Sequence, residues 1–191
     1  MIKDLILQNR SYRRFHQEEK IDLTTLRELV DLARLSASTA NRQPLKYMLS
    51  ADPATNARIF RHLSWAGSLP EWPGPEEGER PSAYIIILGD TEISRNFNCD
   101  HGIVAQSILL GATEKGLGGC MLGGMRKDDL RQVLQIPERY EILLLVALGK
   151  PNETVIIETA EAGASTKYWR DEQSHHHVPK RSLDEIILNL D

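Results

Sequence analysis

The chain has 191 residues, of which 41% are hydrophobic and 26% are charged, so it can bury a sizeable core and has the composition of an ordered globular protein. Its formal net charge of −4 excludes a general nucleic-acid binder or membrane-surface binder, because both need a broad positive field. Cys99 and Cys120 form neither a Cys-x-x-Cys motif nor a disulfide framework. The N-terminus has no apolar stretch of signal-peptide length and no segment approaches membrane-spanning length, so we expect a soluble cytoplasmic protein.

Helices and strands are expected to alternate in the first third of the chain. Residues 2–9 suit a short helix, and apolar residues recur at helical spacing over 23–33, with Asp22 as the expected N-cap. The pattern then predicts a strand over 45–50 and a polar helix over 53–62.

Residues 70–81 contain prolines, glycines and glutamates with almost nothing to bury, so we expect a mobile surface excursion that could serve as a lid. The continuous apolar runs over 84–88 and 142–148 are typical of strands that are covered on both faces. These two strands should therefore be central in the sheet.

Residues 103–112 predict a buried helix, because they are apolar nearly all round, with Asp100 placed to cap its start and Gly116 to end it. A second copy of the chain is the simplest cover for such a helix, so we expect a homodimer. No repeat or linker is visible, and the architecture should be one α+β domain over 1–191 with a sheet of about five strands.

Several familiar chemistries lack their motifs. Residues 116–121 do not fit the Gly-x-Gly-x-x-Gly dinucleotide pattern, and 149–151 lack the upstream glycine and the hydroxyl of a phosphate-binding P-loop. There is no Gly-x-Ser-x-Gly elbow, no His-Glu-x-x-His and no distinctive acid pair. The sequence therefore shows no machinery for hydrolysis.

Two polar segments point to a flavin nucleotide as cofactor. Residues 10–15 offer guanidinium groups and a hydroxyl that suit a phosphate, although such a segment can also be a solvated face. Residues 38–44 offer a hydroxyl and two carboxamides, which can hydrogen-bond along the edge of a flat heteroaromatic ring. The alternative for Ser38 and Asn41 is a helix C-terminal cap and a turn before Pro44.

These segments belong to a set of six motifs through which the chain resembles the FMN-dependent nitroreductases. The family's Arg-Ser-x-Arg-x-Phe, Ser-x-x-Asn-x-Gln-Pro and Asp-x-Gly-Ile-x-Ala-Gln patterns are matched at 10–15, 38–44 and 100–106, and three further motifs at 116–124, 147–151 and 177–183. The resemblance implies a nitroreductase-like fold, with a central, mostly antiparallel sheet surrounded by helices. It also implies an intertwined homodimer with FMN sites at the subunit interface.

The resemblance assigns cofactor-binding roles residue by residue. Phosphate contacts are implied for the first segment and the C-terminal basic pair. Ring contacts are implied for Ser38 and Asn41, and contact with the ribityl chain or the pyrimidine side for Gln43. The turn at 122–124 is expected close to the flavin, although paired glycines more commonly serve only a tight turn. The implied ligands are Arg10, Ser11, Arg13, Arg14, Ser38, Asn41, Gln43, Leu122, Gly123, Gly124, Lys180 and Arg181. Asn9 and Leu45 depart from residues that are common in the family.

The histidine run 175–177 permits a metal or purification-tag interpretation. It continues without a break into Lys180 and Arg181 and then into an expected helix over 183–190, so we interpret it as native chain and assign no metal site. Cys120, in an apolar strand, is expected to pack in the core rather than react.

The function implied by the resemblance is hydride transfer from NAD(P)H through FMN to a small electron-poor acceptor, nitroaromatic or quinone-like, by a ping-pong mechanism. The cofactor performs the difficult step, so no catalytic side chain is assigned. The alternative is a flavin-binding protein without turnover, such as a redox sensor or storage module.

Overall fold

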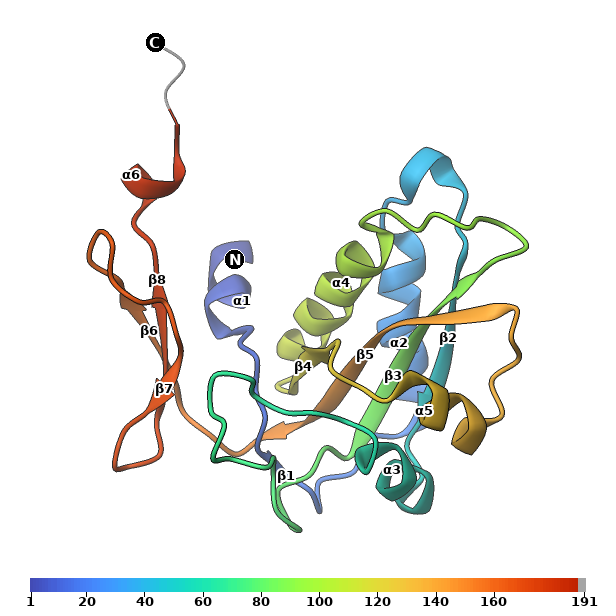
Figure 1. The fold of residues 1–191 in the computed structure, drawn as a ribbon, viewed down its shortest axis with the longest axis horizontal. Helices are drawn as coiled ribbons and strands as arrows, with labels where there is room; N and C mark the ends of the chain where they lie inside the picture. The colour runs from blue at the N-terminus through green and yellow to red at the C-terminus, as the bar shows by residue number, and fades with distance from the viewer. Residues whose placement is uncertain (189–191) are drawn as a thin grey trace. The chain divides into compact units, whose positions relative to one another are not determined.

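The computed structural model describes residues 1–188, which form two compact units (Figure 1). Unit 1 contains residues 1–65 and 74–152, and unit 2 contains residues 66–73 together with the chain from residue 153 onward. The sequence prediction of one domain is not tested by this division and stays a prediction.

Unit 1 is built on a five-stranded sheet in which every pairing is antiparallel. The long strand β5 pairs with β3, β4 and β1, and β3 pairs in turn with β2. The predicted sheet of about five mostly antiparallel strands is therefore confirmed. The strands are β1 (Phe15–His16), β2 (Leu45–Ser50), β3 (Ala83–Asp90), β4 (Gly118–Leu122) and β5 (Tyr140–Pro151).

The four helices predicted for unit 1 are present in the predicted order, whereas the helix over 127–134 was not predicted. Asp22 caps α2 as expected, with its carboxylate accepting a hydrogen bond from the Thr25 amide at 2.7 Å. The helix predicted over 53–62 ends two residues earlier, at Phe60, because the chain turns there with Arg61 as C-cap. The helical elements are α1 (Ile2–Gln8), α2 (Leu23–Leu35), the 3-10 turn η1 (Thr39–Asn41), α3 (Pro53–Phe60), α4 (Asp100–Glu114) and α5 (Lys127–Leu134).

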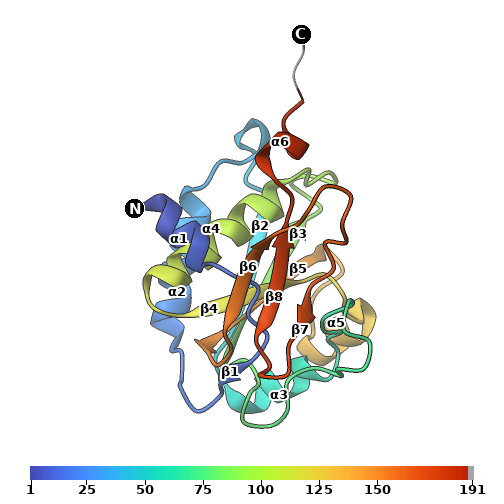
Figure 2. The ribbon, with the colours of Figure 1, turned by 90° about the vertical axis from the view of Figure 1, so that its left-hand side faces the viewer.

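The main hydrophobic core lies between one face of the sheet and the helix pair α2 and α4, which pack side by side (Figures 1 and 2). Every residue of β3 is buried, as the continuous apolar run predicts for a central strand. Ile85 and Ile87 of β3 face Leu29 of α2 and Ile108 of α4 in this core. Burying each such side chain stabilises the fold by about 1.5–3 kcal/mol, so this layer fixes where α4 lies over the sheet.

Unit 2 contains a three-stranded sheet and a short helix. In it, β8 pairs parallel to β6 and antiparallel to β7. Segment 66–73 joins this unit through a hydrogen bond from the Ser68 amide to the Tyr168 hydroxyl at 3.1 Å. The Arg170 guanidinium lies over the Trp72 ring, 4.2 Å from its centroid. The elements are β6 (Val155–Thr159), β7 (Trp169–Arg170), β8 (His176–Lys180) and α6 (Leu183–Ile186).

Two sequence predictions need correction. The helix predicted over 183–190 ends at Ile186, because Ile187 is extended, and the end of the predicted range lies outside the described residues. Segment 70–81 is not an excursion with almost nothing to bury, because Gly74, Pro75 and Pro81 are buried and the segment is divided between the two units. Its suggested role as a lid stays a prediction.

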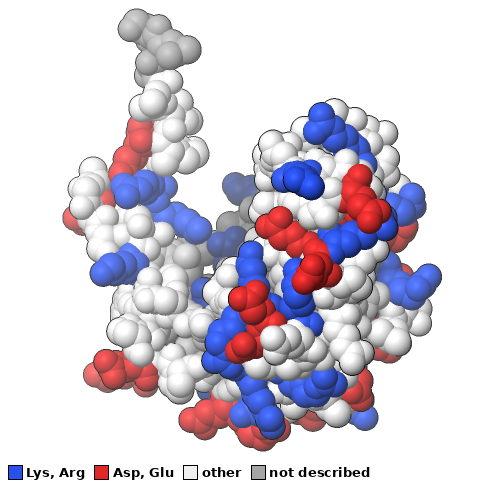
Figure 3. Space-filling view, turned by 45° about the vertical axis from the view of Figure 1, so that its right-hand side comes forward, with Lys and Arg blue, Asp and Glu red and all other residues white. Residues whose placement is uncertain are grey.

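Within residues 1–188, no helix combines the length and the apolar character that crossing a membrane would take. Lys and Arg side chains are interspersed with Asp and Glu over the face of the molecule shown in Figure 3.

Candidate functional site

The 10–14 segment is fixed against the start of β4. Ser11 forms a parallel bridge with Gly119, and the Tyr12 amide donates to the Gly119 carbonyl at 3.0 Å. The Tyr12 ring lies so close to Gly118 that a Cβ there would meet it at 2.5 Å, so glycine is required at this position. The sequence of β4 thus permits the basic segment to lie directly on the sheet.

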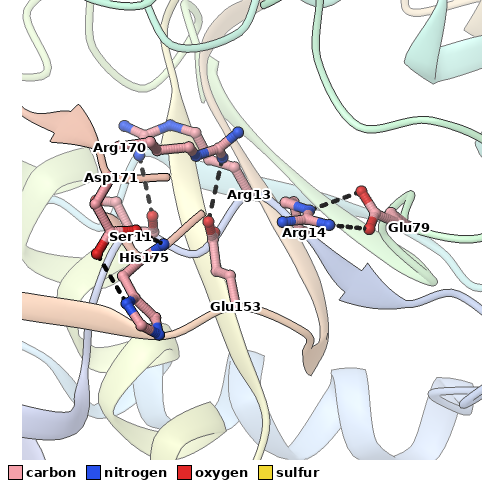
Figure 4. Close-up of polar contacts among 8 residues, drawn as sticks. All are labelled: Ser11, Arg13, Arg14, Glu79, Glu153, Arg170, Asp171 and His175. Atoms are coloured by element: carbon pink, nitrogen blue, oxygen red, sulfur yellow. Dashed lines mark hydrogen bonds and ion pairs between the residues drawn. The ribbon is translucent and has the colours of Figure 1, made fainter. Parts of the chain in front are cut away.

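The arginines of this segment have different surroundings. One terminal nitrogen of Arg10 donates to the Ile6 carbonyl at 2.6 Å, while its Nε is buried and has no hydrogen-bond partner within residues 1–188. Arg13 donates to the Ser11 carbonyl at 3.1 Å. Arg14 forms a two-pronged pair with Glu79, with its Nε 2.8 Å from one carboxylate oxygen (Figure 4). The Nε of Arg10 is therefore a buried donor that could bind a ligand.

The 38–43 loop carries the predicted ring ligands in an unusual backbone conformation. Ala40, Asn41 and Gln43 have φ angles of 51°, 52° and 50°, which L-residues rarely adopt. The carboxamide of Gln43 donates to the Oδ1 of Asn41 at 3.0 Å, and both residues are exposed. Strained backbone of this kind is concentrated at functional sites.

Asp100 holds this loop from the first residue of α4. One oxygen of its buried carboxylate accepts from the Ser38 hydroxyl at 2.6 Å, and the other accepts from the Thr39 amide at 2.9 Å and hydroxyl at 2.8 Å. Burial by itself raises the pKa of Asp100, but the hydrogen bonds from Ser38 and Thr39 outweigh it, so the pKa lies below its ordinary value of 3.8. The carboxylate is therefore ionised at neutral pH.

The prediction that Asp100 caps α4 is wrong. Cys99 occupies the N-cap position and makes no side-chain cap hydrogen bond, while Asp100 is already helical and turns its side chain to the loop. The predicted end of the helix is close to correct, since Lys115 is the C-cap and Gly116 follows it.

The turn after β4 differs from an ordinary glycine turn. Neither Gly123 nor Gly124 has a positive φ, and a Cβ placed on Gly123 would meet nothing within 4 Å. The fold of the described residues therefore does not explain the glycine at position 123, and the turn leaves room beside its backbone. Leu122, just before it, is buried.

The C-terminal basic pair belongs to unit 2. Lys180 ends β8, and its carbonyl accepts from the Ala160 amide at 2.7 Å. Arg181 is exposed and is paired with Glu185 of α6.

A family model described as "Nitroreductase family" matches residues 6–150 of this chain. This range includes the basic segment, the strained loop, α4 and the glycine turn. The chain belongs to the nitroreductase family. The predicted family and the predicted enzyme class, an oxidoreductase, are thereby confirmed.

Individual relatives of this nitroreductase-family chain are distant. A protein from Archaeoglobus fulgidus, named as an NADH dehydrogenase/NAD(P)H nitroreductase, is 24% identical over 148 residues, which are 73% of this chain and 80% of the relative. The FMN reductase (NADPH) of Bacillus subtilis is 32% identical over 97 residues, which are 50% of this chain but only 34% of that protein. The crystal structure of a nitroreductase family protein from Streptococcus pneumoniae has the same fold, with a TM-score of 0.70, 20% identity and coverage of 99% of this chain and 100% of the other.

The nitroreductase fold distributes the predicted ligands of unit 1 over three places. The 10–14 segment lies at the start of β4, which directly follows the C-terminal end of α4, and the 38–43 loop lies at the N-terminal end of α4. The 122–124 turn follows β4 at its far end. Because α4 has 15 residues, its two ends are roughly 22 Å apart. The cofactor-binding roles assigned from the sequence stay predictions.

Sequence reasoning missed two features of the site. It did not find that Asp100 binds the loop, because an acidic residue before a helix is ordinarily a cap. It also did not find the partner of Arg14, because Glu79 lies within a segment that has no secondary-structure signal.

Proposed function

We propose that this chain is an FMN-dependent oxidoreductase that takes hydride from NAD(P)H and passes the electrons to a small electron-poor acceptor, such as a nitroaromatic or a quinone. The observation that carries the proposal is the family match over residues 6–150, which includes both the 10–14 segment and the 38–43 loop. The names of two relatives, an NAD(P)H nitroreductase and an NADPH-dependent FMN reductase, support the same chemistry.

The 10–14 segment fits the phosphate of FMN. A buried N–H group without an acceptor destabilises a protein, so we expect a ligand or a water molecule to accept a hydrogen bond from the Nε of Arg10. Phosphate oxygens are strong acceptors, and guanidinium–phosphate pairs are short and charge-assisted. The hydroxyl of Ser11 and the guanidinium of Arg13 would add donors from the same segment. The phosphate contacts expected of Lys180 and Arg181 stay predictions.

The 38–43 loop and the turn at Gly123 fit the ring of FMN. The exposed carboxamides of Asn41 and Gln43 can both donate and accept, as the polar edge of the flavin ring requires. The Ser38 hydroxyl already donates a hydrogen bond to Asp100. Ser38 would therefore affect ring binding through the conformation of the loop. The open space at Gly123 would let the backbone approach the ring closely.

A homodimer would bring the 10–14 segment of one chain close to the 38–43 loop of the other. The two lie near opposite ends of α4, so within unit 1 of a single chain they do not surround one ligand. A second copy, related by two-fold symmetry, would place its loop near the first copy's basic segment and create two equivalent sites. Ile103 on α4 is 39% exposed and would be covered by such a contact.

FMN, when bound, would supply the hydride and electron-transfer chemistry. The residues of this chain would bind and orient it: Arg10, Ser11 and Arg13 at the phosphate, Asn41 and Gln43 at the edge of the ring. No side chain is needed as a proton donor in this scheme, so substitutions should act through the affinity and orientation of the flavin.

The proposal is tested by reconstituting the purified protein with FMN and following the flavin absorption anaerobically. We expect NADH or NADPH to bleach the bound flavin, and a quinone or nitroaromatic to restore its colour, with parallel lines in double-reciprocal steady-state plots. Bound flavin that NAD(P)H bleaches without sustained turnover would favour the redox sensor or storage module instead. Failure to bind FMN would contradict both.

A further inference from the structure

The buried carboxylate of Asp100 is directed entirely at one loop. Within residues 1–188 it accepts three hydrogen bonds, one from Ser38 and two from Thr39, which lie 62 and 61 positions earlier in the sequence. An ionised acceptor makes these bonds stronger than neutral ones. Asp100 itself stands on α4, which is held in the main core through Val104 and Ile108. The loop is therefore anchored to a helix that packs in the main core of unit 1.

The hydrogen bonds continue from Asp100 into the strained part of the loop. The Ser38 hydroxyl, which donates to Asp100, also accepts a hydrogen bond from the backbone amide of Gln43 at 3.0 Å. This contact closes the loop over Ala40 and Asn41, whose positive φ angles are unfavourable in a free chain. Without its anchor, the loop would relax toward ordinary backbone conformations, and the two carboxamides would lose their fixed positions.

We propose that Asp100 is a positioning residue for flavin binding, which holds the 38–43 loop in its strained conformation so that Asn41 and Gln43 are prearranged for the ring. This inference rests on the proposed function. A loop that is already ordered loses less entropy when a ligand binds, so the effect of Asp100 should appear in flavin affinity although its side chain faces the loop.

The first test uses the apoprotein and needs no flavin. Arg42 is exposed within the loop, so the rate of tryptic cleavage after Arg42 reports loop opening. We expect Asp100→Asn to raise this rate about tenfold or more, because an amide cannot accept all three hydrogen bonds. Cleavage after Lys167, in an exposed loop of unit 2, serves as the internal reference and should not change.

The second test measures FMN affinity by fluorescence quenching. We expect Asp100→Asn to weaken binding about tenfold or more, and to change the visible circular dichroism of the flavin at saturation, which a general loss of stability would not do. The matched control is Asp22→Asn, because Asp22 also lies at a helix start but at the far end of α2 from the loop. It should leave both readouts as in the wild type.

A milder pair of variants keeps the test decisive if Asp100→Asn does not fold. Thr39→Val removes one donor to Asp100, whereas Thr39→Ser keeps it. We expect faster cleavage after Arg42 and weaker FMN binding for Thr39→Val only.

The inference is overturned if the Asp100→Asn protein folds and shows wild-type cleavage and FMN affinity, or if both Thr39 variants behave alike. Loss of the proposed function is a different result, because then the wild-type protein itself would not bind FMN.

Discussion

Arg10 and Arg14 lie four positions apart, yet their environments predict different effects on flavin binding. Arg10 has a buried donor without a partner within residues 1–188, whereas Arg14 is already paired with Glu79. We expect Arg10→Ala to weaken FMN binding about tenfold or more, since hydrogen bonds to charged groups contribute about 1.5–3 kcal/mol. Arg14→Ala should change it less than about threefold. FMN titration of both variants checks this.

Thermal unfolding supplies the control for this comparison. Because the Arg14–Glu79 pair is partly exposed, its loss should lower the melting temperature by only a few degrees. Equal loss of FMN affinity in both variants would contradict the distinction and would support the sequence-based assignment of Arg14 to the phosphate.

At the scale of an element, the sheet of unit 2 contains a pH-sensitive contact. His177 of β8 lies between two carboxylates, with its Nδ1 2.6 Å from Glu158 and its Nε2 3.2 Å from Asp171, and it stacks on Trp169. The pKa of His177 lies above its ordinary value of 6.5 because the imidazole hydrogen-bonds to two carboxylates, with the larger effect from Asp171 and the smaller from Glu158. Hydrogen bonds from His177 and His175 overcome the effect of burial on Asp171 and lower its pKa from 3.8 to about 2.

The sign of the pH dependence follows from these directions. The raised pKa of His177 means that its contribution to stability is fully present below pH 6.5 and is lost as the pH rises through its folded-state pKa. The lowered pKa of Asp171 means that its contribution is present above pH 3.8 and is lost as the pH falls toward 2.

We therefore expect His177→Gln to lower the melting temperature most between pH 4.5 and pH 6 and progressively less above pH 7. Melting curves of wild type and variant across this range measure the difference, and NMR titration measures the pKa. His16→Gln, at a more exposed histidine of β1, is the control. A stability difference that is the same at every pH would rule out the protonated imidazole as its source.

For the whole molecule, the separation of the 38–43 loop from the 10–14 segment predicts FMN sites that are shared between two subunits. We expect the homodimers of Arg10→Ala and of Asn41→Ala each to bind FMN weakly, because each variant damages both sites. The mixed dimer of the two variants should regain one high-affinity site, since one of its sites then receives an intact residue from each chain. Calorimetric titration of tagged mixed dimers gives the number of sites.

The reciprocal mixture provides the control. A dimer of the wild type with the Arg10→Ala, Asn41→Ala double variant should have no intact site if the sites are shared, and one if each chain forms its own. A reversal of these two results would show that each site is built within one subunit.

The amino-acid sequence determined most of the elements in unit 1 and the family. Burial on both faces produces continuous apolar runs, so β3 and the interior of β5 could be predicted from residues 84–88 and 142–148. The cap at Asp22 depends on a residue only three positions away. Such features are local, and the order of the family's motifs is itself a property of the sequence.

Only the tertiary structure decided which residues the key polar groups contact. Asp100 binds Ser38 across 62 positions and Arg14 binds Glu79 across 65, and no local pattern encodes a partner at that distance. The division of segment 66–81 between two units has the same origin, because Trp72 packs on Arg170 far along the chain. A sequence pattern reports what a residue does with its near neighbours, whereas the topology of the sheet and α4 decides which distant residues meet.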